Sequence, residues 1–421
     1  MNRHTASLSL SLMKGVFRSL NNRNYRIWAA GALVSNVGTW MQRTAQDWLV
    51  LTGLTHRNAT AVGIVMALQY GPQLLFLPWT GFAADYFDRR KLLLVTQAAK
   101  GVLALMLGLL TVFGAVVLWH VYVLAFLLGT VSAFDQPARQ TFVYDLVGDT
   151  DLSNAIALNS TSFNAARLIG PAVAGVVVAA VGSGWAFLVN AASFVAVVWS
   201  LTLLRRDELH ARVRIARTRG HFGEGLRYVW EHRELRVTAI MLFLIGTFGL
   251  NFPIYISTMS ASVFHVGADR FGLLMSMMAV GSLIGALLAA RRERPTFGLL
   301  LAGAAVFGGG LLMAALMPDY VLFGLALIVV GVAALTFTNS SNSLMQLSAE
   351  PSMRGRVIAI RASIALGGTP IGAPIVGWVA DRLGPRCGVG VGAAAGLAAA
   401  MVAAHYLWKH RRSQSSFGKS W

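Results

Sequence analysis

The composition of this 421-residue chain is that of a protein solvated by lipid rather than by water. Hydrophobic residues make up 56% of the sequence and charged residues only 12%, whereas a soluble domain carries about 25% charged residues. A fold whose whole surface faces water is therefore excluded. The single cysteine, Cys387, also excludes a disulfide within the chain.

The formal net charge of +18 orients the chain in a membrane and does not indicate a nucleic-acid partner. Of the 35 Lys and Arg residues, 28 fall in segments that a cytoplasmic N-terminus would place in the cytoplasm. The opposite loops hold four, at Arg57, Arg270, Arg382 and Arg386. This asymmetry follows the positive-inside rule and predicts that both termini are cytoplasmic. The basic segments would also attract anionic membrane lipid.

Apolar runs recur along the whole chain, and each is long enough to cross a hydrocarbon core of about 30 Å as a helix. The segment 1–24 has no continuous apolar stretch of the signal-peptide type, so we expect it to be a cytoplasmic N-terminal segment. The runs predict an all-α membrane protein with twelve transmembrane helices, at residues 27–51, 61–83, 92–114, 117–137, 155–181, 185–204, 238–263, 271–290, 298–317, 320–345, 357–380 and 387–408.

The first apolar run contains two opposite charges, Arg43 and Asp47, which are spaced to lie on one face of a helix. A carboxylate inside the membrane can carry protons when loss of hydration raises its pKa. Asp47, with Arg43 as its partner, is therefore our first candidate for a proton-coupling site. The alternative is an interfacial ion pair beside Trp40 and Trp48, within the aromatic belt of the membrane.

The second apolar run ends in a dense charge cluster, GFAADYFDRR, at residues 81–90. The stretch resembles the signature G-x-x-x-D-R-x-G-R-R that follows the second helix in the major facilitator superfamily of transporters. Tyr86 and Asp88 stand where that family has its first Arg and its second Gly. The resemblance implies a conformational latch that holds the two halves in the outward-facing state; the alternative is a plain cytoplasmic turn. The positions that match are Gly81, Asp85, Arg89 and Arg90.

Two ionisable residues lie within the third and fourth apolar runs. Asp135 precedes Arg139 by four residues near the cytoplasmic end of the fourth run, and we expect it to be a partner of Arg89 in the latch. Lys100, in the third run, is expected to extend its ammonium group toward the cytoplasmic headgroups.

The stretch ARLIGPAVAG in the fifth apolar run combines a cation with residues that bend a helix. Pro171 frees a backbone carbonyl and bends the helix, while Gly170 and Gly175 permit close packing. The stretch is similar to the fifth-helix Gly-Pro motif of antiporters in the same superfamily. Arg167 falls near mid-membrane, where a guanidinium is costly. It could contact an anionic or polar substrate, relay the coupling proton, or brace the bend as a fixed ion pair.

Uncharged polar side chains inside the apolar runs are candidates for a substrate cavity. Such groups can orient a ligand in mostly apolar surroundings, and hydrogen bonds between helices explain them equally well. Together with Arg167, the candidate cavity residues are Gln69, Tyr70, Asn164, Asn251, Tyr255 and Asn339.

Internal repetition suggests two related halves. Residues 154–182 align with residues 356–384 at an offset of 202, and GWVADRLG at 377–384 resembles the charge-cluster signature again, on the periplasmic side. Duplicated halves of this kind place a transporter's binding site between them. We therefore expect two pseudo-symmetric six-helix bundles at 25–204 and 237–408, a cytoplasmic linker at 205–236 and a cytoplasmic tail at 409–421.

The pattern of the whole chain, including SNVGTWMQRTAQDWLVL and NSTSFNAARLIGP, is similar to the drug and siderophore (enterobactin) exporter branch of the superfamily. The resemblance implies a monomeric inner-membrane transporter that works by alternating access and exports a small amphipathic molecule in exchange for protons. The alternatives are a proton-coupled importer or facilitator of a small metabolite and, from another class, an integral-membrane enzyme or sensor. The sequence contains no phosphate-binding loop or hydrolase motif, so we expect no enzyme activity, catalytic residue, metal or cofactor.

Overall fold

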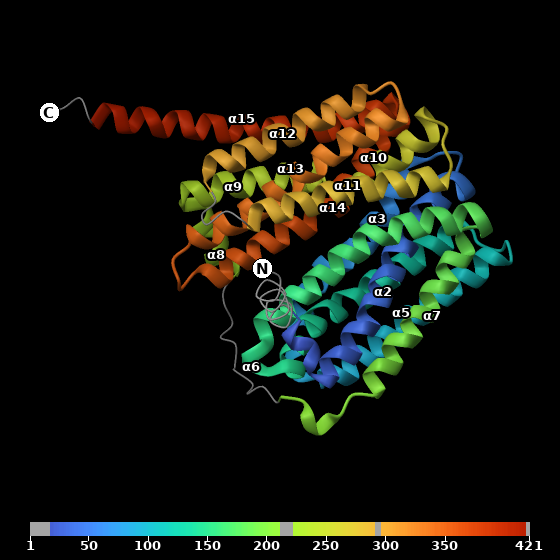
Figure 1. Cartoon of the computed structure of the whole chain (residues 1–421). Helices are drawn as coiled ribbons and strands as arrows, with labels where there is room; N and C mark the ends of the chain where they lie inside the picture. Colours follow the sequence, from blue (N-terminus) through green and yellow to red (C-terminus); the bar gives the residue numbers. More distant parts are fainter. Residues whose placement is uncertain (1–16, 211–221, 291–295, 418–421) are drawn as a thin grey trace, which may run out of the picture. The chain divides into compact units, whose positions relative to one another are not determined.

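The structure is a computed structural model that describes residues 17–210, 222–290 and 296–417 (Figure 1). All regular secondary structure in this described part is helical, as the sequence predicts. Contacts divide the chain into two compact units. Unit 1 comprises Met1–Gln46 and Leu75–Ala216, and unit 2 comprises Asp47–Leu74 and Arg217–Trp421. The segment 47–74 is thus grouped with the carboxyl-terminal part of the chain, and the arrangement in two six-helix bundles stays a prediction.

Unit 1 contains the longest helix of the described chain, α6, which holds two of the expected spans. Gly148 divides α6 with φ 66° and ψ −168°, a backbone conformation that only glycine adopts readily. The expected spans 117–137 and 155–181 lie on either side of it. The helices of unit 1 are η1 (Arg18–Asn21), α2 (Arg23–Trp48, to Gln46), α4 (Leu77–Tyr86), α5 (Arg89–Val112), α6 (Leu118–Val181), α7 (Ser183–Thr202) and η3 (Arg206–Glu208).

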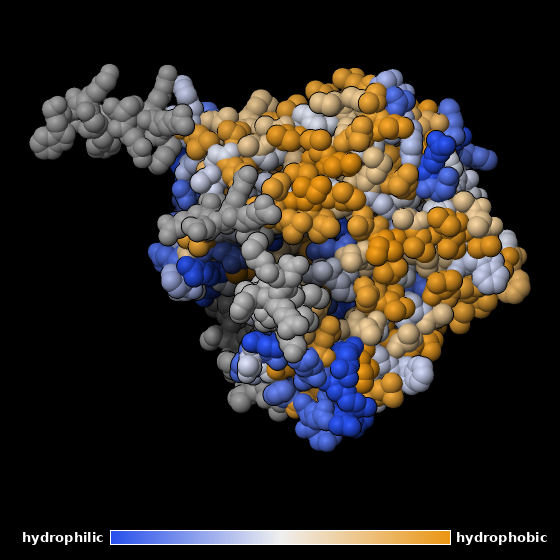
Figure 2. All heavy atoms as spheres, in the orientation of Figure 1, coloured by the Kyte–Doolittle hydropathy of each residue, from blue (hydrophilic) through white to orange (hydrophobic). Residues whose placement is uncertain are grey.

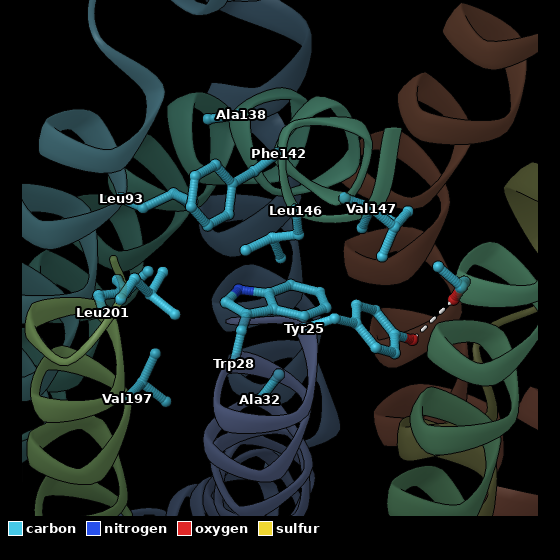
Figure 3. Packing of buried hydrophobic residues seen from close by; sticks show 13 residues of the cluster. Tyr25, Trp28, Ala32, Leu93, Ala138, Phe142, Leu146, Val147, Val197 and Leu201 are labelled. Atoms are coloured by element: carbon cyan, nitrogen blue, oxygen red, sulfur yellow. Dashed lines mark hydrogen bonds between the residues drawn. The ribbon is translucent and has the colours of Figure 1, made fainter. Parts of the chain in front are cut away.

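An apolar core joins α2, α5, α6 and α7 at one end of unit 1 (Figure 3). Trp28 and Phe142 are at most 2% exposed and lie at its centre. The hydroxyl of buried Tyr25 donates to the carbonyl oxygen of Ala155 at 2.9 Å, as the dashed line in Figure 3 shows. A buried tyrosine needs such a partner for its polar end, so the ring contributes packing without leaving an unpaired hydroxyl.

Unit 2 packs its helices through small residues. A Cβ on Gly281 would lie 2.0 Å from the carbonyl oxygen of Ile328, and a Cβ on Gly308 would lie 2.5 Å from the amide nitrogen of Leu397. Only glycine permits such backbone contact, which membrane helices favour. The helices are α3 (Ala59–Leu75, to Leu74), α8 (Phe222–Glu231), α9 (Arg233–Leu244), α10 (Phe252–Thr258), α11 (Ala268–Ala290), α12 (Phe297–Leu316), α13 (Tyr320–Leu347), α14 (Arg354–Leu383) and α15 (Pro385–Phe417).

The expected spans 61–83 and 238–263 are not single helices. Phe76 separates α3 from α4, with Pro78 in the first turn of α4. In the seventh span, wide π-helical turns η4 (Ile245–Gly249) and η5 (Met259–Val263) flank α10. Turns of this kind leave backbone carbonyls without their usual partner, and they are frequent at functional positions of helices.

The outward surface of the helices suits a hydrocarbon solvent. Nine helices or helix runs in the described part of the chain are long and apolar enough to cross a membrane. Large apolar side chains lie on their outer faces, such as Val95 and Trp199, with exposed fractions of 67% and 66%. Figure 2 shows hydrophobic residues over the visible helix faces and hydrophilic ones gathered in patches near helix ends. The chain is a multi-pass membrane protein; the count of twelve spans stays a prediction.

Candidate functional site

The charge cluster after α4 fastens the start of α5 to its neighbours in unit 1. Asp88 caps α5 by accepting the amide of Lys91 at 3.1 Å. Arg89 Nη1 donates to Asp145 Oδ1 at 2.6 Å, and Arg90 Nε donates to the carbonyl oxygen of Leu201 at 2.8 Å, near the end of α7. The cluster therefore ties α5 to both α6 and α7.

The expected pairing of Asp135 with Arg89 is wrong. Asp135 lies deeper, opposite Lys100, whose position on α5 is eleven residues beyond Arg89. At a rise of about 1.5 Å per residue those two α5 positions are roughly 16 Å apart. Of the other latch residues, Gly81 lies within α4, and the side chain of Asp85 lies outside the part of the chain that the structure describes.

Asp135 is the centre of a buried polar cluster inside unit 1. It is 1% exposed. Its carboxylate accepts hydrogen bonds from Lys100 at 2.7 Å, Gln97 at 2.6 Å and Thr96 at 2.8 Å, all on α5. Arg139 lies 3.5 Å from the same carboxylate. A buried charge requires such a set of partners, and here two cations and two neutral donors surround the carboxyl group.

The position of Lys100 corrects a second expectation. The side chain does not extend to the headgroups: Lys100 is 8% exposed and its ammonium group bonds to Asp135. Arg139 continues the polar network to the first helix by donating to the side-chain oxygen of Asn36 at 3.1 Å. The reason is energetic. A buried carboxylate such as Asp135 is strongly destabilising without a cationic partner, and pairing with it stabilises Lys100 away from the headgroups.

A second group of ionisable residues surrounds Trp40 on α2. The guanidinium carbons of Arg43 and Arg167 lie 5.3 Å and 5.7 Å from the Trp40 ring centre, within the range of cation–π attraction. Phe163 packs edge-on against the same ring at 5.8 Å and is 46% exposed. One indole thus gathers two guanidinium groups and an exposed phenyl ring in unit 1.

The Gly-Pro stretch of α6 explains how Arg167 reaches Trp40. A Cβ on Gly170 would lie 2.5 Å from the Cβ of Trp40, so only glycine allows α6 to approach α2 this closely. Pro171 lies inside α6 and cannot donate to the carbonyl of Arg167, four residues earlier. Gly175 is buried one turn further on. The stretch therefore positions Arg167 next to α2.

Asp47 is buried, with 6% of its surface exposed, one helical turn beyond Arg43 on α2. The amide of Gln42, on the same helix, accepts a hydrogen bond from Asn190 on α7 at 2.5 Å. Burial of the Asp47 carboxyl agrees with what proton coupling would need, and its role stays a prediction.

Two candidate cavity residues of unit 2 support the broken seventh span. Asn251 is fully buried at the start of α10 and donates to the carbonyl oxygen of Thr247 at 2.7 Å. The hydroxyl of buried Tyr255 donates to the carbonyl of Phe248. Both carbonyls belong to the π-helical turn η4, so these side chains satisfy backbone groups that the irregular helix leaves unpaired.

The remaining candidate cavity residues belong to both units. Gln69 is 8% exposed on α3, and Tyr70 follows it. Asn164 donates within its own helix, to the carbonyl oxygen of Ser160 at 2.9 Å. Asn339 is half-buried on α13. Gln69, Tyr70, Asn251, Tyr255 and Asn339 fall in unit 2, whereas Arg167 and Asn164 fall in unit 1.

Sequence reasoning missed the roles of Lys100, Arg139, Asn36 and Arg361. Arg361 lies two turns into α14, and its Nη2 donates to the carbonyl oxygen of Thr338 at 3.3 Å. For Lys100 the available signal was the presence of an acid within the next span, which predicts an ion pair between neighbouring helices.

Comparison with known proteins identifies the kind of molecule that carries these sites. The family described as transmembrane secretion effector, of the major facilitator superfamily, matches residues 14–416. The staphyloferrin A transporter of Staphylococcus aureus is 27% identical over 356 residues, covering 83% of this chain and 87% of its own. The multidrug efflux pump Tap of Mycolicibacterium fortuitum is 28% identical over 377 residues, covering 84% and 88%.

Solved structures share the fold. A point mutant of the nucleoside transporter NupG superposes with a TM-score of 0.73 at 14% identity, over 91% of this chain and 98% of its own. A POT family transporter in complex with 5-aminolevulinic acid gives a TM-score of 0.72 at 12% identity, over 92% and 96%. The chain therefore belongs to the transmembrane secretion effector family of the major facilitator superfamily, and it is a multi-pass membrane transporter and not an enzyme.

Proposed function

We propose that the protein exports a small amphipathic molecule across the bacterial inner membrane in exchange for protons, as a monomer with both termini in the cytoplasm. Export as the direction of transport is supported by relatives named as multidrug efflux pumps and a macrolide efflux protein. The positive-inside charge distribution supports the orientation. Alternating access, in which the transport site opens to one side at a time, is the mode of action.

The group around Trp40 is the observation that carries the proposal. An indole and an exposed phenyl ring offer apolar contact, while the guanidinium groups of Arg43 and Arg167 offer charge-assisted hydrogen bonds to a polar substituent. An amphipathic molecule presents both kinds of surface. Asn164 lies one turn before Arg167 on α6 and adds a neutral polar group.

Asp47 is the acid that we propose for proton coupling. Asp135 suits that role less well, because its oxygens already accept from Lys100, Gln97 and Thr96. Protonating Asp135 would take away the anion that pairs with buried Lys100 and with half-buried Arg139. Asp47 is also buried and lies one turn from Arg43, so a proton gained there would change the charge beside the Trp40 group.

The test is transport by purified protein in liposomes with an imposed pH gradient. Fluorescent dyes and iron-chelating siderophores serve as probes, and the direction of their movement relative to the proton gradient is recorded. We expect efflux driven by inward proton flow, and loss of that dependence in Asp47→Asn. The exposed acid Asp207 supplies the matched control, Asp207→Asn.

Two outcomes would contradict the proposal. Probe movement in the same direction as the protons would show an importer, and movement without any effect of the gradient would show a facilitator. Full proton coupling in Asp47→Asn would exclude Asp47 as the coupling acid while leaving export intact.

A further inference from the structure

A short pattern occurs at the ends of two different helices in this chain. Residues 78–85 read PWTGFAAD and residues 374–381 read PIVGWVAD. Both have Pro, then Gly three residues later, an aromatic residue next, and Ala-Asp at the end. The first copy contains the cytoplasmic signature. The second copy lies at the end of α14, in the part of the chain that the charge distribution assigns to the periplasmic side.

The acid of the second copy, Asp381, caps a helix from which it is more than 300 residues distant in sequence. Its Oδ1 accepts the amide of Ala59 at 2.7 Å. Its Oδ2 accepts the amide of Thr60 at 2.8 Å and the Thr60 hydroxyl at 2.5 Å. Ala59 and Thr60 open α3, where the first amides have no partner within the helix. A carboxylate at this end of a helix also interacts favourably with the helix dipole.

Close backbone contact brings the two helices together below this cap. A Cβ on Gly377 would lie 2.5 Å from the carbonyl oxygen of Ala59, and a Cβ on Gly63 would lie 2.4 Å from that of Ala373. Such contacts contain no interlocking large side chains. The pair α3 and α14 can therefore separate without leaving a hole in an interdigitated core, and the ionic cap supplies the specific attraction at this end.

The cap is also next to open space. A cavity of about 400 Å³ is lined by Asp381, by His56, Arg57 and Asn58 before α3, and by Gly384 after α14. Water can enter such a polar space and replace the hydrogen bonds that Asp381 makes when the two helices part. The cap is therefore reversible in a way that a fully buried carboxylate would not be.

Capping the start of α3 does not by itself require an acid from a distant part of the chain. Asn58, in the adjoining loop, already accepts the amide of Ala61 at 2.9 Å. The start of α13 is capped within its own turn, where Asp319 accepts the amides of Val321 and Leu322 at 2.8 and 3.0 Å. A local residue would only cap α3, whereas Asp381 also connects α3 to α14.

We propose that Asp381 is a releasable latch, which holds the outer end of α3 against α14 and opens during each transport cycle. This inference rests on the proposed function, because export requires an outward-open state. Gly63 and Gly377 allow α3 and α14 to approach each other, and the hydrogen bonds of the Asp381 carboxylate stabilise the closed contact. The pattern shared with residues 78–85 suggests that the two ends of the second span are controlled by acids of the same kind.

The first experiment measures opening directly. Nitroxide labels are placed on His56→Cys and on the native exposed Cys387, and their separation is measured by pulsed electron resonance in lipid nanodiscs. We expect Asp381→Asn to raise the ratio of long to short distances about tenfold or more, the equivalent of one hydrogen-bonded charge. Thr60→Val, which loses one of the three bonds, should give a smaller shift in the same direction.

The matched control is Asp319→Asn, which removes a carboxylate cap from a helix start without touching α3. It should leave the distance distribution unchanged. Equal distributions for the parent and Asp381→Asn proteins would overturn the latch. The measurement needs no substrate, so a failure of the proposed export function would not affect it.

The second experiment locks the contact. Thr60→Cys and Asp381→Cys are combined in a Cys387→Ser background and oxidised. We expect the cross-link to reduce gradient-driven dye transport at least about tenfold, and a reductant to restore it. Transport at the full rate by cross-linked protein would show that α3 and α14 need not part, and would refute the proposal.

Discussion

Replacing Asp135 in the Lys100–Asp135 cluster should lower the free energy of unfolding by more than replacing Lys100. Asp135→Asn would leave Lys100 and Arg139 together, two cations with no carboxylate between them. Breaking a buried pair in this way costs about 3–5 kcal/mol in the free energy of unfolding. Lys100→Met would leave Asp135 with Arg139, Gln97 and Thr96, a cluster with no net charge. The expected loss is then about 1–3 kcal/mol.

The assay is unfolding of the purified protein in mixed micelles with increasing fractions of a denaturing detergent, followed by tryptophan fluorescence. The double variant Lys100→Met with Asp135→Asn should be more stable than Asp135→Asn alone, because one of the two unpaired cations is gone. Arg227→Met, in an exposed pair with Glu231, is the control and should unfold like the parent protein.

The order of the two single variants tests the reasoning. If Lys100→Met unfolds as readily as Asp135→Asn, net charge in the buried cluster does not govern its stability. If neither variant differs from the Arg227→Met control, the cluster is hydrated in the native protein.

Three further predictions follow from single contacts. Gly170→Ala places a Cβ in a space occupied by α2 and should lower the unfolding free energy by about 1–3 kcal/mol and reduce export, as measured in the same micelles and liposomes. Tyr255→Phe should cost about 1–3 kcal/mol by leaving a buried carbonyl of η4 unpaired, and a loss below that of an exposed Tyr86→Phe would contradict this. Arg89→Gln and Asp145→Asn should show a coupling energy of about 1–2 kcal/mol in a double-mutant cycle; additive effects would refute the pairing.

The helical membrane architecture could be predicted from the sequence because its signal is long and physically simple. A helix such as α12 or α5 has to present apolar side chains to lipid over its whole length. The resemblance of residues 81–90 to a superfamily signature likewise led to the correct family, which the comparisons confirm. The irregular places were not predicted, although a proline lies beside each of them. Pro78 follows the break at Phe76, and Pro253 is in the first turn of α10, between the two π-helical turns.

The partners of buried charges were the weakest part of the prediction. Asp135 was assigned to Arg89 because the two lie toward the same membrane face, but the pairing depends on depth and on which faces of α5 and α6 meet. One sequence does not show which faces of two neighbouring helices meet, so it could not identify Lys100, three turns beyond Arg89 on α5, as the partner of Asp135. By contrast, Gly170 was expected to permit close packing, and the structure shows a close approach at this position, with α2 as the partner helix.

Arg90 fastens α5 to α7 through main-chain oxygens alone, those of Leu201 and Thr202. Every amino acid supplies the same oxygen, so the identity of residues 201 and 202 can drift over evolutionary time without loosening this joint. Among relatives, Arg90 should therefore be conserved, and no other position should show substitutions correlated with it. Methods that infer contacts from correlated substitutions would overlook the joint, although it fixes where two helices end.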